Sequence, residues 1–86
     1  MKKKTIAILG STGSIGESTL EIVRKTKEYK VKLLMVNKNY SKIISQINFF
    51  KPEIVIINNE NTYLKIKKKL GKKKIKILNN IENVKK

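Results

Sequence analysis

Three glycines at a spacing of three residues, early in the chain, restrict the fold more strongly than any other feature. Gly10, Gly13 and Gly16 follow directly after the apolar run 5–9 and open a segment with helical spacing. A strand, a glycine turn and a helix in this order bring backbone N–H groups and the positive end of a helix dipole together, which favours an anion. We expect Gly10 to adopt the angles of the tight turn, Gly13 to let main chain approach a phosphate, and Gly16 to let the helix pack on the strand. The pattern predicts a site for the pyrophosphate of a dinucleotide.

The expected donors to that pyrophosphate lie in the turn itself. Their N–H groups belong to Thr12, Gly13, Ser14 and Ile15. The hydroxyl groups of Thr12 and Ser14 are further donors. Glycines also mark ordinary turns, so the motif alone is weak evidence. The strand before it and the helix after it supply the context that the dinucleotide fingerprint requires.

Apolar runs alternate with helical patterns along the rest of the chain. The runs 5–9, 31–36, 54–57 and 75–78 predict strands, and the segments between them predict helices. Such alternation with short connections predicts an α/β fold, a partial Rossmann-like doubly wound parallel sheet of about four strands in a three-layer sandwich. A chain of 86 residues holds at most one such domain.

Helix faces and ends follow from the same spacing. The first helix is expected to bury a face made of Ile15, Thr19, Ile22 and Val23. Ser41 is expected to cap the second helix, and Gly71 to end the third.

We expect the residues at the end of the second strand to determine which cofactor binds. An NAD enzyme usually places a carboxylate there for the ribose hydroxyls. This chain instead has Asn37, Lys38 and Asn39, about 20 residues beyond the glycines. Lys38 attracts a ribose phosphate that a carboxylate would repel, and the two amides can donate to it. The segment favours NADP over NAD. The absence of a carboxylate is stronger evidence for this preference than Lys38, because lysine is common throughout the chain.

Composition excludes several kinds of chemistry. The chain has no Cys and no His, and its six acidic residues are scattered, so we expect no catalytic residue and no metal ligands within it. A net charge of +15 would fit a nucleic-acid partner, but Arg24 is the only arginine among 21 basic residues. We interpret the excess lysine as compositional drift and the runs at 65–69 and 72–74 as solvated surface.

The N-terminus carries no membrane signal. Met1 and the three basic residues Lys2 to Lys4 precede an apolar run too short for a signal peptide or a membrane span. We therefore expect a cytoplasmic protein with no membrane partner.

The residues resemble one family in particular. The string Ile8 to Gly16, the helix residues 18–20, the Lys38-Asn39 pair and the segment 50–52 before an apolar strand are similar to the start of 1-deoxy-D-xylulose 5-phosphate reductoisomerases. The similarity runs from Thr5 to about Leu78. The resemblance places the cofactor contacts on Thr12, Gly13, Ser14 and Ile15 and on Asn37, Lys38 and Asn39. The family usually has a small residue and then Gly before the Lys-Asn pair, where this chain has Val36 and Asn37.

The resemblance also implies an activity. Such enzymes rearrange and reduce 1-deoxy-D-xylulose 5-phosphate to 2-C-methyl-D-erythritol 4-phosphate in non-mevalonate isoprenoid biosynthesis, using NADPH and a divalent metal, Mg or Mn. It implies a phosphosugar substrate and a homodimer, and it makes residues 1–86 the N-terminal NADPH-binding domain. The family's catalytic and C-terminal domains would lie outside this chain, which we expect to be a fragment, a truncated product or one part of a split enzyme, inactive alone. Two alternatives stay open, a small basic nucleic-acid-binding protein and an inactive truncated remnant.

Overall fold

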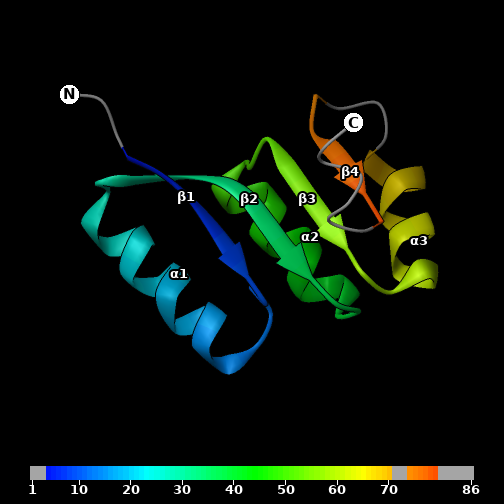
Figure 1. Ribbon diagram of the computed structural model, residues 1–86, viewed down its shortest axis with the longest axis horizontal. Coiled ribbons are helices and arrows are strands. Elements are labelled where there is room, and N and C mark those ends of the chain that lie inside the picture. Colours follow the sequence, from blue (N-terminus) through cyan, green and yellow to red (C-terminus); the bar gives the residue numbers. More distant parts are fainter. Residues whose placement is uncertain (1–3, 71–73, 80–86) are drawn as a thin grey trace.

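Seven elements alternate strictly between strand and helix in the computed structural model, which describes residues 4–70 and 74–79 (Figure 1). The strands are β1 (Lys4–Leu9), β2 (Tyr29–Val36), β3 (Ile54–Ile57) and β4 (Lys76–Leu78). The helices are α1 (Ser14–Thr26), α2 (Tyr40–Phe50) and α3 (Glu60–Leu70). The predicted strands are confirmed to within two residues at each end. Gly71, the expected end of the third helix, lies outside the described residues.

The four strands form one parallel sheet in the order β1-β2-β3-β4. Leu9 lies opposite Met35, and Met35 lies opposite Ile56, so the carboxyl ends of the first three strands meet at one edge of the sheet. The register of β1 and β2 shifts between Ile6 and Ala7. The predicted Rossmann-like parallel α/β fold is confirmed.

All three helices of the described residues cover the same face of the sheet. Leu34 and Val36 alternate with Met35 on β2 and therefore point to one side. Leu34 lies in a buried cluster with Leu20 of α1, and Val36 lies in a second cluster with Ile43 of α2 and Ile66 of α3. The expected three-layer sandwich is therefore wrong for this part of the chain, which has two layers. Strands added always in the same direction with right-handed crossovers place successive helices on one face.

The buried face of α1 also differs from the prediction. Gly16, Leu20 and Val23 are buried, whereas Ile15 and Ile22 are 85% and 60% exposed. The close approach of Gly16 to the glycine turn rotates the helix so that positions four and seven residues further on face the sheet. Ile15 and Ile22 then lie off that face.

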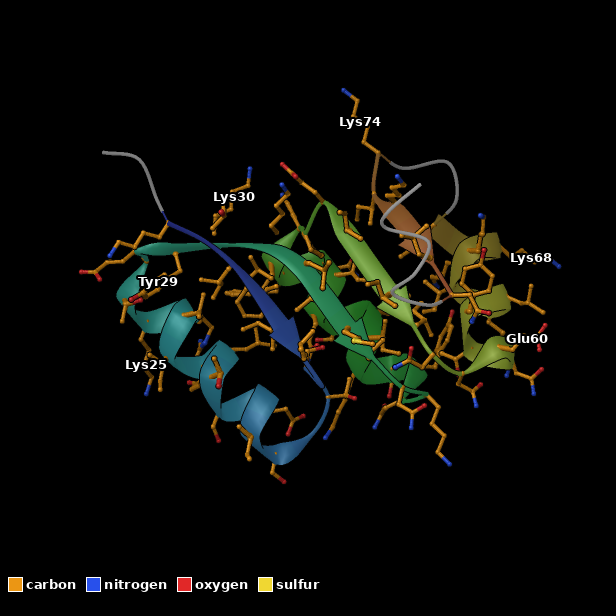
Figure 2. All side chains as sticks on the ribbon, viewed as in Figure 1. Lys25, Tyr29, Lys30, Glu60, Lys68 and Lys74 are labelled. Atoms are coloured by element: carbon orange, nitrogen blue, oxygen red, sulfur yellow. The ribbon has the colours of Figure 1, made fainter. Side chains whose placement is uncertain are left out.

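The lysines are spread over the surface. Lys65, Lys67, Lys68 and Lys69 are all exposed on α3, as predicted for a solvated helix face. Figure 2 shows Lys25, Lys30, Lys68 and Lys74 extending outward from separate elements. Lys72 and Lys73 lie outside the described residues. Among the residues that are described, no helix is long and apolar enough to cross a membrane.

Candidate functional site

The glycine turn joins β1 to α1 at the carboxyl edge of the sheet. Gly10 has φ +73°, a left-handed angle that favours glycine, as predicted. The N–H groups of Gly10 and Ser11 both donate to the carbonyl of Met35, at 2.7 and 3.1 Å. Gly13 N–H donates to the carbonyl of Gly10 at 3.0 Å and closes the turn. The turn is therefore tied to β2 as well as to its own strand.

Gly16 lies where α1 passes over this turn. It is buried, and an added Cβ would lie 2.7 Å from the Cα of Ser11. The predicted role of Gly16 in close helix packing is confirmed. Without this approach the first turn of α1 would move away from the strand end that it follows.

The start of α1 offers unpaired donors. Gly13 is the N-cap, and no side chain caps this end of the helix. Within the described residues, the N–H groups of Thr12, Ser14 and Ile15 donate to no acceptor. Gly13 was expected to be a fourth donor, but its N–H is used inside the turn. Three of the four predicted main-chain donors, together with the helix dipole, therefore remain for an anion.

The side chains of the turn surround these donors without covering them. Thr12 is half-buried, and Gly13, Ser14 and Ile15 are exposed. An added Cβ at Gly13 would reach no closer than 3.4 Å to the carbonyl oxygen of Gly10. The extended backbone of Gly13, at φ −84°, is open to any residue. A requirement for glycine at this position would therefore come from the close approach of a ligand and not from the backbone angles.

The second predicted segment, Asn37 to Asn39, leaves the end of β2 next to the glycine turn. All three of its residues are exposed. The side-chain oxygen of Asn39 accepts from Lys42 N–H at 3.2 Å, which makes Asn39 the N-cap of α2. The prediction that Ser41 caps this helix is wrong, because α2 begins at Tyr40 and Ser41 lies inside its first turn. The Nδ2 group of Asn39 is left as the donor toward a ligand.

The charges in the Asn37–Asn39 segment favour a phosphate group on the ribose of the cofactor. Lys38 takes part in none of the ion pairs of the described residues, and Asn37 to Asn39 include no acidic residue. The acidic residue at this edge that follows β3 is Glu60, at the start of α3. A carboxylate that could bind two ribose hydroxyls is absent from the described end of β2. The segment therefore fits a 2′-phosphorylated ribose better than an unmodified one.

Residues of α2 brace the glycine turn, and sequence reasoning missed them. Gln46 Nε2 donates to the carbonyl of Ser11 at 2.8 Å, and Lys42 Nζ pairs with Glu17 Oε1 at 2.7 Å. Ser11 is fully buried, and its hydroxyl has no hydrogen-bond partner in the described structure. The one available signal was Gln46 itself, a polar residue next to the buried face of α2.

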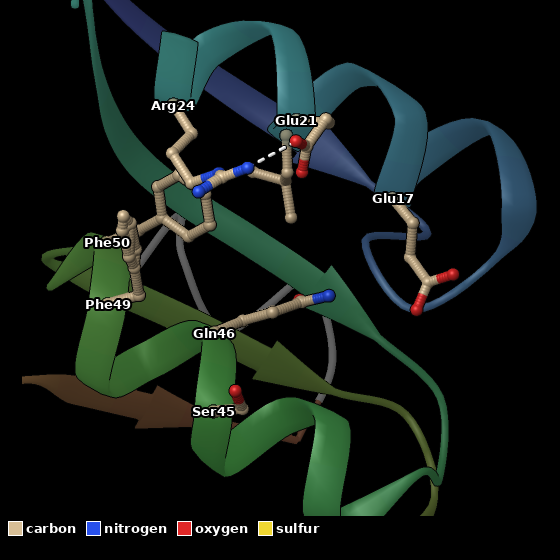
Figure 3. A pocket seen from close by; sticks show the side chains of 8 residues that line it. Glu17, Glu21, Arg24, Ser45, Gln46, Phe49 and Phe50 are labelled. Carbon is tan, nitrogen blue, oxygen red and sulfur yellow. Dashed lines mark hydrogen bonds and ion pairs between the residues drawn. The ribbon is translucent and has the colours of Figure 1, made fainter.

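A hollow of about 400 Å³ lies beside this brace, between α1 and α2 (Figure 3). Glu17, Glu21 and Arg24 line it on the α1 side, and Gln46, Phe49 and Phe50 on the α2 side. Arg24 donates to Glu21, and that hydrogen bond lowers the pKa of Glu21 below its ordinary value. The cations beside this hollow are already paired with Glu17 and Glu21, so we assign the phosphate contacts to the α1 N-terminus and not to this hollow.

No metal site is formed by the described residues. They contain no group of three or more His, Cys, Asp or Glu side chains that could hold an ion. The residues present therefore do not fit the divalent metal that the resemblance implies. They do fit a dinucleotide, through the unpaired N–H groups of the glycine turn and the uncharged or basic segment after β2.

Comparisons with known proteins agree with this geometry. The family model described as 1-deoxy-D-xylulose 5-phosphate reductoisomerase matches residues 6–86. A reductoisomerase of that name from Pelagibacter ubique is 45% identical over 84 residues, which cover 96% of this chain and 22% of that protein. The one from Buchnera aphidicola is 46% identical over 74 residues, covering 85% and 19%.

Solved structures give the same result. The reductoisomerase from Zymomonas mobilis in complex with NADPH superposes with a TM-score of 0.80 at 26% identity, covering 90% of this chain and 21% of that one. A DOX-P reductoisomerase in complex with NADPH, fosmidomycin and magnesium gives 0.82 at 28% identity, covering 94% and 20%. The chain thus spans about a fifth of the length of these relatives. None of these matches supports the nucleic-acid-binding alternative.

Proposed function

Because this chain belongs to the 1-deoxy-D-xylulose 5-phosphate reductoisomerase family, we propose that it is the NADPH-binding part of such an enzyme. The observation that carries the proposal is the meeting of two segments at one sheet edge. The glycine turn offers unpaired N–H groups there, and the neighbouring Asn37–Asn39 segment has Lys38 in place of a carboxylate. Two relatives have solved structures in complex with NADPH.

Each segment has its own task in this proposal. Thr12, Ser14 and Ile15 donate main-chain N–H groups to the pyrophosphate, and Gly13 keeps the approach free of a side chain. Lys38 and the amide groups of Asn37 and Asn39 bind the phosphate of the adenosine ribose. Asn37 stands where the family usually has Gly, so its side chain is part of this pocket in the present chain.

The bound cofactor would supply a hydride to the substrate. The chain's own residues hold and orient it, and none of them is proposed to transfer a proton. Polypeptide outside the 86 residues would supply the divalent-metal ligands, the phosphosugar site and the catalytic groups, so the chain would form the N-terminal domain of a longer enzyme. The family resemblance extends the proposal to a homodimer in the cytoplasm, on the isoprenoid pathway, that converts 1-deoxy-D-xylulose 5-phosphate to 2-C-methyl-D-erythritol 4-phosphate.

Calorimetric titration of the 86-residue chain with NADPH, NADH and a short DNA duplex tests this function. We expect NADPH to bind more tightly than NADH, and the duplex to bind weakly and to be displaced by salt. A chain with the circular dichroism of an α/β protein that binds neither nucleotide would contradict the proposal.

A chimera tests the same site under turnover. This chain would replace the matched 84 residues of the Pelagibacter ubique relative. We expect the chimera to oxidise NADPH in the presence of 1-deoxy-D-xylulose 5-phosphate and Mg²⁺. A folded chimera with no NADPH affinity would contradict the proposed site.

A further inference from the structure

The segment that enters α3 holds the main chain of the Asn37–Asn39 turn. The carbonyl at the end of β2 and the first two carbonyls of the turn accept hydrogen bonds from it: Val36 O from Asn58 N at 3.0 Å, Asn37 O from Asn59 N at 3.2 Å, and Lys38 O from Thr62 Oγ1 at 3.1 Å. The first continues the parallel pairing of β2 with β3, and the second comes from backbone just beyond that pairing. The third comes from a side chain, so it depends on the residue type at position 62.

Thr62 is placed for this contact by its own helix. It is 7% exposed, and its N–H donates to the side chain of Asn59 at 3.0 Å, in the first turn of α3. Its hydroxyl does not bond back to its own helix, as threonine hydroxyls often do, but reaches the carbonyl of Lys38, 24 residues earlier in the chain.

The direction of these carbonyl groups decides the direction of the neighbouring N–H groups. A trans peptide is planar, so the C=O of one residue and the N–H of the next point in opposite directions. With Asn37 O and Lys38 O both directed to the α3 segment, the N–H groups of Lys38 and Asn39 face away from it. Within the described residues neither N–H donates to an acceptor. Two adjacent N–H groups turned to one side favour an anion.

We propose that Thr62 is a positioning residue for the ribose phosphate of the cofactor. By holding the carbonyl of Lys38, it turns the N–H of Asn39 toward the phosphate and sets the direction in which the Lys38 side chain leaves the main chain. This inference rests on the proposed function. Thr62 touches no cofactor atom in it and acts through the turn, so its loss affects the phosphorylated ribose more than the rest of the dinucleotide.

Three variants of the full chain test the proposal by titration with NADPH and NADH. Thr62→Val keeps the shape and removes the donor, and we expect its dissociation constant for NADPH to rise about fivefold to tenfold, the effect of one lost hydrogen bond. The constant for NADH should change by roughly twofold at most. Thr62→Ser keeps the hydroxyl and should restore NADPH binding. Thr26→Val is the matched control, because Thr26 donates to a helix carbonyl, that of Val23, at the far end of α1.

Each outcome separates the positioning role from a structural one. Equal weakening of both nucleotides in Thr62→Val, unchanged binding, or failure of Thr62→Ser to restore it would overturn the inference while leaving the proposed function intact. A wild-type chain that is folded and binds neither nucleotide would overturn the proposed function, and this inference with it.

A second measurement needs no variant, in case Thr62→Val fails to fold. In the NMR spectrum of the wild-type chain, 2′-AMP should move the amide proton of Asn39 downfield, and 5′-AMP should leave it in place. An Asn39 amide that responds to neither nucleotide would overturn the inference.

Discussion

A Cβ added at Gly16 would lie 2.1 Å from the carbonyl oxygen of Gly10, inside any allowed contact distance. This carbonyl oxygen belongs to backbone that the turn holds in place, so it cannot rotate away as the end of a side chain would. We expect Gly16→Ala to lower the free energy of unfolding by about 2–3 kcal/mol, although alanine in a helix normally adds about 1 kcal/mol over glycine. Urea unfolding followed by circular dichroism measures this. A variant as stable as the wild type would mean that α1 packs further from the turn.

Gly13→Ala is the contrasting change in the same motif. The backbone of Gly13 is extended and the new Cβ has an ordinary contact at 3.4 Å, so stability should stay within roughly 0.5 kcal/mol of the wild type. Gly13→Val should likewise fold, because only Gly10 uses a positive φ in this turn. Binding of NADPH by Gly13→Val should weaken about tenfold or more, since a branched side chain would stand where the pyrophosphate meets bare backbone. Unchanged NADPH affinity in a folded Gly13→Val chain would remove the turn from the site.

Lys38→Glu tests which cofactor the segment after β2 selects. The new carboxylate repels a ribose phosphate but can accept from ribose hydroxyls, so NADPH affinity should fall by about tenfold to a hundredfold and NADH affinity should hold or rise. Lys68→Glu makes the same charge change on the exposed face of α3 and controls for net charge. Titration with both nucleotides at fixed salt compares the two variants. Equal losses for NADPH and NADH in Lys38→Glu would show that Lys38 does not face the phosphate.

The brace between α2 and the glycine turn has a stability signature. Gln46→Met removes the donor to the Ser11 carbonyl, and we expect a loss of about 1–2 kcal/mol in unfolding free energy. Ser11→Ala removes a buried hydroxyl that has no partner, so it should be neutral or stabilise by up to about 1 kcal/mol. Urea unfolding of both variants decides this. A Ser11→Ala chain that lost stability would show that the hydroxyl has a partner.

The order of strands and helices and the two cofactor segments were predictable from local patterns. Runs of β-branched residues, helical spacing and the Gly10-Gly13-Gly16 turn each depend on a few neighbouring residues. The exposed Ile15 and Ile22 were not predictable in this way. Apolar spacing on α1 fits two overlapping faces, and the backbone contact of Gly16 with the turn chooses between them.

The sequence by itself determined the type of each element, the glycine turn and the absence of a carboxylate after β2, because residue identity and near-neighbour sterics are enough for these. Only the tertiary structure decided that all described helices cover one sheet face, that Gln46 braces Ser11, and that Thr62 holds the carbonyl of Lys38. Those contacts join residues 24 or 35 positions apart. Their geometry follows from strand order and crossover handedness, which no local pattern encodes.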